Sequence, residues 1–115
     1  MLDVKDSIMR LARTVEQHHA HIAARHEFSR EWAIQFELAY TDFRVIQVAL
    51  QLDGTRHDLL VRFASAYDDV YVYEYAFAAG GLEGFDEKFA GRMESYKSDV
   101  DLLLAIIAEI GAING

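Results

Sequence analysis

The stretch FSREWAIQFELAYTDFRVIQVALQL, residues 28–52, decides the fold of this chain. Its apolar side chains recur at steps of three and four, which is the spacing of one face of an α-helix. Those side chains belong to Phe28, Trp32, Phe36, Ala39, Phe43, Ile46 and Leu50. Neither glycine nor proline interrupts the run. A helix with a long aromatic stripe must bury that stripe, so we expect the other segments to pack on this one.

The composition is typical of one helical domain. The chain has 115 residues, of which 52% are hydrophobic, and a chain of this size buries a substantial core. Proline is absent, alanine is abundant and threonine is scarce, which favours helices over strands. We therefore predict a single helical domain over residues 1–115.

Further helices are predicted on both sides of the central stretch. The first begins near Asp3, and a polar segment within His26–Ser29 is expected to separate it from the central helix. A third helix follows Gly54, which is suited to ending a helix. The glycines within residues 80–84 indicate a loop, and the last helix is expected to start at Phe85 or the next residue. Four helices joined by short loops predict an all-α, antiparallel four-helix bundle.

Two alternatives remain open from the sequence. The apolar spacing continues over residues 4–50 without a phase slip, which allows a variant with one long N-terminal helix plus two helices, assembled as a dimeric bundle. Residues 43–77 also contain β-branched and aromatic runs around a possible hairpin turn, Asp53-Gly54. In that case they would form a three-stranded sheet between two helical segments.

Charge and composition exclude several classes of function. A net charge of -8 argues against direct binding of nucleic acid and of anionic membranes, and it is compatible with a basic protein partner. The longest apolar run, Leu102–Ala108, is far shorter than the roughly 20 residues that span a bilayer. The N-terminus lacks the pattern of a signal peptide, and cysteine is absent. We therefore expect a soluble, cytoplasmic protein.

One end of the predicted bundle collects histidines. The alternating direction of the helices should bring together His18, His19, His26 and Glu74. Glu16 and His19 form a Glu-x-x-His pattern, which metal-binding bundles use, but those sites need two such motifs and further carboxylates. The favoured interpretation is a polar cluster in which His26 or His19 satisfies Glu74, with no metal and no cofactor.

A second apolar stripe predicts an interface. Ile34, Leu38, Val45 and Leu52 lie across the central helix from its aromatic stripe, and Leu102 and Ile106 form a similar pair on the last helix. One face of each helix is enough for a small four-helix core, so a second apolar face indicates another neighbour. We expect a homodimer built on these residues.

No catalytic motif is present in the sequence. The glycines at 80 and 81 lack the lysine and spacing of a phosphate-binding loop, and no serine occupies a nucleophile elbow. The sequence therefore favours a small acidic, non-enzymatic protein that acts by binding another protein, such as an inhibitor, an immunity or antitoxin-like regulator, or a secretion chaperone. The alternative is a metal-binding helical bundle that uses the histidine-rich end.

Overall fold

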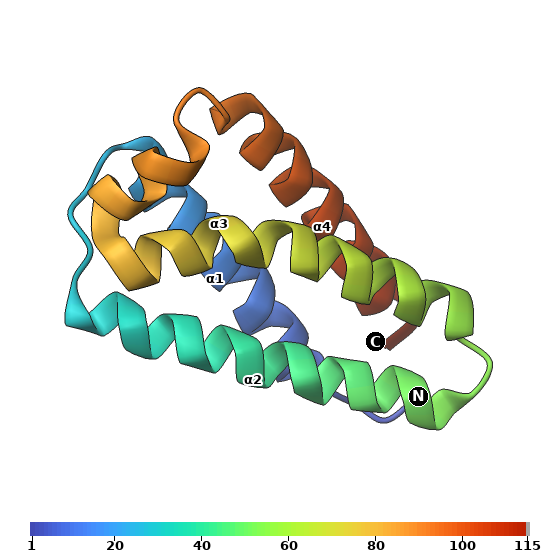
Figure 1. Cartoon of the computed structure of the whole chain (residues 1–115). Helices are drawn as coiled ribbons and strands as arrows, with labels where there is room; N and C mark the ends of the chain where they lie inside the picture. The colour runs from blue at the N-terminus through green and yellow to red at the C-terminus, as the bar shows by residue number, and fades with distance from the viewer. Residues whose placement is uncertain (115) are drawn as a thin grey trace.

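The computed structural model describes residues 1–114 and contains four helices (Figure 1). They are α1 (Lys5–Ala23), α2 (Arg30–Asp53), α3 (His57–Phe89) and α4 (Met93–Asn114). Successive helices run in opposite directions, as predicted for an antiparallel bundle. Residues 43–77 lie in α2 and α3, and no strand occurs among the described residues, so the three-stranded sheet is wrong.

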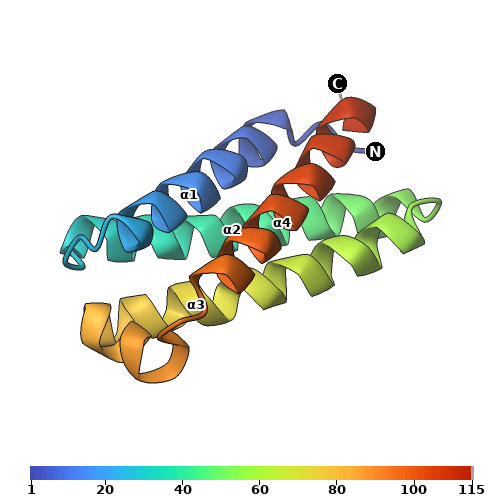
Figure 2. The same cartoon turned by 90° about the horizontal axis from the view of Figure 1, so that it is seen from above.

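The helices pack as a four-membered ring. Each helix contacts the next along the chain, α4 also contacts α1, and α1 reaches α3 across the middle. Helices α2 and α4 share no contact and lie on opposite sides of the bundle, as the two views show (Figures 1 and 2). Among residues 1–114, no other helix therefore covers the outer side of α2. Among residues 1–114 no helix is long and apolar enough to cross a membrane.

The break between α1 and α2 was predicted, and the structure shows how it is made. The N–H of Arg25 donates to the carbonyl of Ile22, and the N–H of His26 donates to that of His21, both at 3.0 Å. This is the Schellman pattern of hydrogen bonds, and Arg25 takes the left-handed conformation (φ 62°) that glycine usually takes there. The guanidinium of Arg25 also binds the carboxylate of Asp86 on α3 through two contacts of 2.5 and 2.6 Å. The variant with one long N-terminal helix is therefore wrong.

The second half of the chain bends at Gly81, within the predicted segment 80–84, and turns again at Gly91, which was not predicted as a break. Gly81 (φ 64°, ψ -156°) bends α3, but helical turns continue to Phe89 instead of opening into a loop. The turn before α4 lies around Gly91 (φ 76°), so α4 begins at Met93 and not at Phe85. Phe85 itself is 1% exposed, because the bend folds the end of α3 back onto the core.

The core follows the predicted stripes along most of the bundle. The helix-spaced stripes predict nine residues that are largely buried together: Trp32, Phe36, Phe43, Phe63, Val70, Phe89, Val100, Leu103 and Ile107. Six of the nine are buried: Phe43, Phe63, Val70, Val100, Leu103 and Ile107. Trp32 and Phe89 pack against this core but remain partly exposed. Phe36 is also partly exposed, and its ring lies near those of His18 and Tyr71. Trp32 and Phe36 lie near the start of α2, at the end of the bundle, where fewer helices surround them.

Candidate functional site

The outer face of α2 is a continuous apolar surface. The predicted residues are strongly exposed there: Ile34 (63%), Leu38 (55%), Val45 (39%) and Leu52 (68%). Val48, which the sequence analysis did not single out, lies on the same face and is 40% exposed. The opposite face of α2 packs into the core, and no other helix covers this one. Leu2 and Val4 of the N-terminal segment line a hollow with Val45 and Val48, so this part of the row is less exposed than its two ends.

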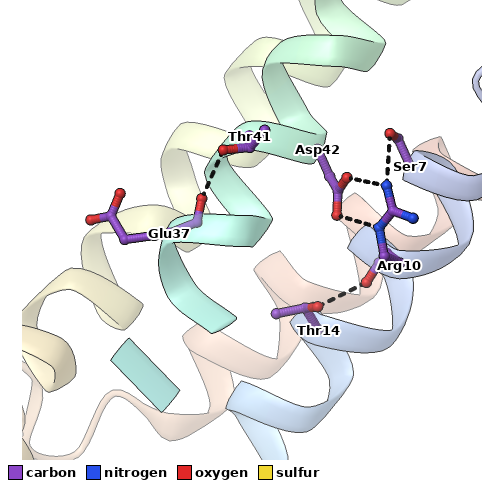
Figure 3. A network of polar contacts seen from close by, with 6 residues as sticks. All are labelled: Ser7, Arg10, Thr14, Glu37, Thr41 and Asp42. Carbon is purple, nitrogen blue, oxygen red and sulfur yellow. Dashed lines mark hydrogen bonds and ion pairs between the residues drawn. The ribbon is translucent and has the colours of Figure 1, made fainter. Parts of the chain in front are cut away.

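A partly buried ion pair between Arg10 of α1 and Asp42 of α2 holds the two helices together next to this surface (Figure 3). The Asp42 carboxylate is only 4% exposed and accepts hydrogen bonds from Nε and Nη2 of Arg10, at 3.3 and 3.0 Å. Arg10 Nη2 also donates to the Ser7 hydroxyl at 3.4 Å. A two-pronged contact between a guanidinium and a carboxylate sets both position and rotation, so it holds the apolar face of α2 outward. The sequence analysis missed this pair, although an Asp within a buried run signals a partner.

Thr41 lies on the exposed face between Leu38 and Val45. Its hydroxyl donates to the backbone carbonyl of Glu37 at 3.2 Å, one turn earlier in the same helix (Figure 3). Because the hydroxyl of Thr41 already has a hydrogen-bond partner within α2, another protein could cover Thr41 without leaving that hydroxyl unpaired. The methyl group of Thr41 would then contribute an apolar contact.

The residues expected to extend this surface from α4 lie elsewhere. Leu102 is 54% exposed, but Ile106 is 5% exposed and belongs to the core. Leu102 borders a shallow hollow with Val61 of α3. Since α2 and α4 do not touch, this hollow is a separate patch and does not continue the α2 surface.

The histidines at this end of the bundle form two clusters, His18 with Glu74 and His21 with His26, and His19 belongs to neither. His18 Nδ1 lies 3.1 Å from Glu74 Oε2, and these two side chains are buried, at 6% and 4% exposure. His26 instead contacts His21, with 3.0 Å between their Nδ1 atoms. His19 packs its ring on Tyr96, with 4.9 Å between centroids. The prediction that His26 or His19 satisfies Glu74 is therefore wrong, and the neighbouring His18 does so.

Burial controls the electrostatics of the Glu74 carboxyl. Desolvation raises the pKa of Glu74, and the hydrogen bond from His18 opposes this rise. Glu74 Oε1 and His18 Nε2 are buried without a hydrogen-bond partner, as is the hydroxyl of Tyr96. Burying a polar atom without a hydrogen-bond partner costs free energy, so these three atoms reduce the stability that this part of the core contributes.

Neither cluster has the ligand set of a metal centre. Within residues 1–114, no group of three or more His, Asp or Glu side chains is arranged to hold a metal ion. His18 and Glu74 face each other, while His19 and His26 turn to other partners. No protein-family model, curated protein or solved structure matches this chain.

Proposed function

We propose that this chain is a small acidic, non-enzymatic protein that acts by binding other proteins, and that it does so as a homodimer formed through the outer face of α2. The observation that supports the proposal is the exposed apolar surface of α2, which extends from Ile34 to Leu52. This distance is about 27 Å at 1.5 Å per residue. Isolated exposed apolar residues are common on proteins, but a row along a whole helix is typical of an interface.

The spacing of this row favours a helix as its neighbour. Leu38, Val45 and Leu52 are seven residues apart, and so are Ile34, Thr41 and Val48. Together they alternate steps of four and three, which is the seam of a coiled coil. Five of the six seam positions are apolar, and the Thr41 hydroxyl is satisfied internally.

A second copy of α2 is the simplest neighbour of this kind. A two-fold axis sets the same seam against itself, so one surface supplies both sides of the interface. Burying the seam gains about 25 cal/mol for each Å² of apolar surface removed from water. The net charge of -8 on each chain opposes association, but ordinary salt screens charges beyond roughly 8–10 Å.

The patch formed by Leu102 and Val61 remains free in such a dimer, because it lies on the side of the bundle away from α2. We assign it to the protein that the dimer regulates. The negative charge of the chain favours a basic partner. The proposal includes an inhibitor, an immunity or antitoxin-like regulator and a secretion chaperone, and the lack of cysteine fits a cytoplasmic setting.

The homodimer is tested by placing charge in the seam. We expect the unmodified protein to sediment as a dimer at high micromolar concentration. The double substitution Leu38→Glu and Val45→Glu should give a monomer with unchanged helicity by circular dichroism, because both side chains are exposed in one chain. The matched control is Ser95→Glu with Ser98→Glu, which adds the same charge at exposed positions of α4 and should remain a dimer.

Two outcomes would count against the homodimer. Sedimentation of the unmodified protein as a monomer would remove the second copy. Unfolding by the α2 substitutions, with the α4 control folded, would show that the seam belongs to the core of a single chain.

A further inference from the structure

The hollow between α3 and α4 is an open apolar groove. Its lining includes two buried side chains, Ala66 of α3 and Ile106 of α4, at 3% and 5% exposure. Val61 and Leu102 border it and are about half exposed, at 52% and 54%. The groove has a volume of about 300 Å³. The exposure of its two bordering side chains leaves it accessible to another protein.

The length of the groove matches about two turns of a helix. Its lining on α3 extends from Val61 to Asp69, which is about 12 Å at 1.5 Å per residue. Side chains three or four residues apart lie on the same face of a helix. An amphipathic helix that lies in such a groove therefore places two apolar side chains, one turn apart, against its apolar lining.

The basic side chain in the lining of the groove is already neutralised. The guanidinium of Arg62 donates to the carboxylate of Glu109 on α4 at 2.9 and 3.1 Å, and to that of Asp58 at 3.1 Å. Two carboxylates thus face one guanidinium at this end of the groove. An acidic partner would find no free cation there.

The other end of the groove carries two further carboxylates. Asp69 belongs to the lining, and because α3 and α4 run in opposite directions (Figure 1), Asp99 of α4 lies near it. Burial raises the pKa of the Asp99 carboxyl and the charge of Asp69 raises it further, while a hydrogen bond from Tyr73 opposes the rise. Within residues 1–114, neither Asp69 nor Asp99 forms an ion pair with a basic side chain. A cation supplied by another protein would reduce the repulsion between them.

We propose that this groove binds a basic amphipathic helix of the regulated protein, an inference that rests on the proposed function. Two apolar side chains of that helix occupy the groove between Val61 and Leu102. A lysine or arginine one turn further along pairs with Asp69 and Asp99, and it fixes the position of the helix along the groove. The net charge of -8 on the chain accelerates the approach of such a basic partner.

The test uses a dye-labelled model peptide whose leucines form one face of a helix and whose lysines form the other. Binding to the unmodified protein is followed by fluorescence anisotropy, and the bound position is mapped by NMR chemical-shift changes. We expect saturable binding, with shifts centred on residues 61–69 and 99–106. A peptide of the same composition in scrambled order has the same charge but no apolar face, and it should bind about ten-fold more weakly.

Two variants at exposed positions locate the site, and each has a matched control. Leu102→Ser removes an apolar side chain that the peptide covers and should weaken binding about ten-fold. Its control is Leu38→Ser, a leucine of similar exposure (55%) on α2. Asp69→Asn removes one charge pair and should weaken binding about two- to five-fold. Its control is Glu16→Gln, which removes the same charge at an exposed position of α1. Both controls should bind the peptide as the unmodified protein does.

Three results would overturn the proposal. The first is no saturable binding of the amphipathic peptide, or equal binding of the scrambled one, which would reduce the interaction to charge alone. The second is weaker binding by Leu38→Ser with unchanged binding by Leu102→Ser, which would place the peptide on α2. The third is a Leu38→Glu, Val45→Glu protein that remains a dimer until Leu102→Glu is added, which would make a second copy the occupant of the groove.

The homodimer and the groove are tested separately. Sedimentation decides the homodimer, whereas peptide binding decides the groove. The monomeric Leu38→Glu, Val45→Glu protein should bind the peptide as tightly as the dimer does, because the groove lies outside the α2 seam. A monomeric unmodified protein that binds the peptide would therefore contradict the homodimer and support the groove.

Discussion

His18 of α1 and Glu74 of α3 meet in the core, with 3.1 Å between Nδ1 and Oε2, although 56 residues separate them in sequence. They join the two helices that face each other across the bundle. Both side chains are almost completely buried, so each depends on the other for its polar contact. The pair therefore sets how α1 and α3 are rotated at this end of the molecule.

A double-mutant cycle measures this dependence. His18→Leu alone leaves a buried carboxyl without its partner, and Glu74→Leu alone leaves a buried imidazole without its partner. We expect each single variant to lower the free energy of unfolding by about 3–5 kcal/mol. His18→Leu combined with Glu74→Leu removes both polar groups, and this protein should be at least as stable as the unmodified one. The measurement is urea denaturation followed by circular dichroism. Additive losses in the double variant would show that the two residues act independently.

The second prediction concerns pH and the contact between His21 and Trp32. Their rings stack with 3.9 Å between centroids, and His21 also touches His26. Desolvation lowers the pKa of His21, with smaller contributions from His26 and His18. A histidine whose pKa is lowered in the folded state contributes stability above its ordinary pKa of about 6.5 and loses it as pH falls through the folded value.

We therefore expect Trp32 emission to change as the pH falls below about 6.5, with a midpoint below the ordinary histidine pKa. The change should disappear in His21→Gln and persist in His57→Gln, which alters an exposed histidine at the start of α3. A midpoint at or above the ordinary value, or an unchanged titration in His21→Gln, would contradict this assignment.

The third prediction concerns the left-handed residue Arg25. An L-residue in that conformation costs about 1–2 kcal/mol relative to the right-handed one, and glycine avoids most of the cost. Arg25→Gly and Arg25→Ala both lose the contact with Asp86, so their difference reports the backbone alone. We expect the glycine variant to be the more stable by about 1 kcal/mol in urea denaturation. Equal stability would mean that the turn does not keep this conformation in solution.

The fourth prediction compares two phenylalanines of the aromatic core. Phe63 is fully buried, and Phe63→Ala should cost about 3–5 kcal/mol of unfolding free energy. The sequence stripe suggests a similar cost for Phe36, but that ring is partly exposed near the end of the bundle. Phe36→Ala should therefore cost clearly less than Phe63→Ala. The comparison uses melting temperatures and urea midpoints, and the reverse order would show that the start of α2 is better covered than the structure indicates.

The sequence was sufficient for the helices because their signals are local. The stripe over residues 28–52 predicts α2, and Gly54, with φ of 73°, ends it as expected. The break before α2 was also predicted, since its polar residues interrupt an apolar face. The exposed row from Ile34 to Leu52 follows from the same periodicity, because a stripe opposite the core stripe turns outward when no other element covers it.

Tertiary structure alone decided which neighbouring residues reach which partner. His18 and His19 differ by about 100° around α1, so the rotation of that helix determines which of them meets Glu74. Leu102 and Ile106 share a stripe in the sequence, yet only Ile106 turns into the core. Several glycines near residue 81 allow a break in the sequence, and in the fold Gly81 takes the bend while Phe85 is buried in the core. Local periodicity thus determines the faces of the helices, whereas long-range packing determines how each face is turned and what it meets.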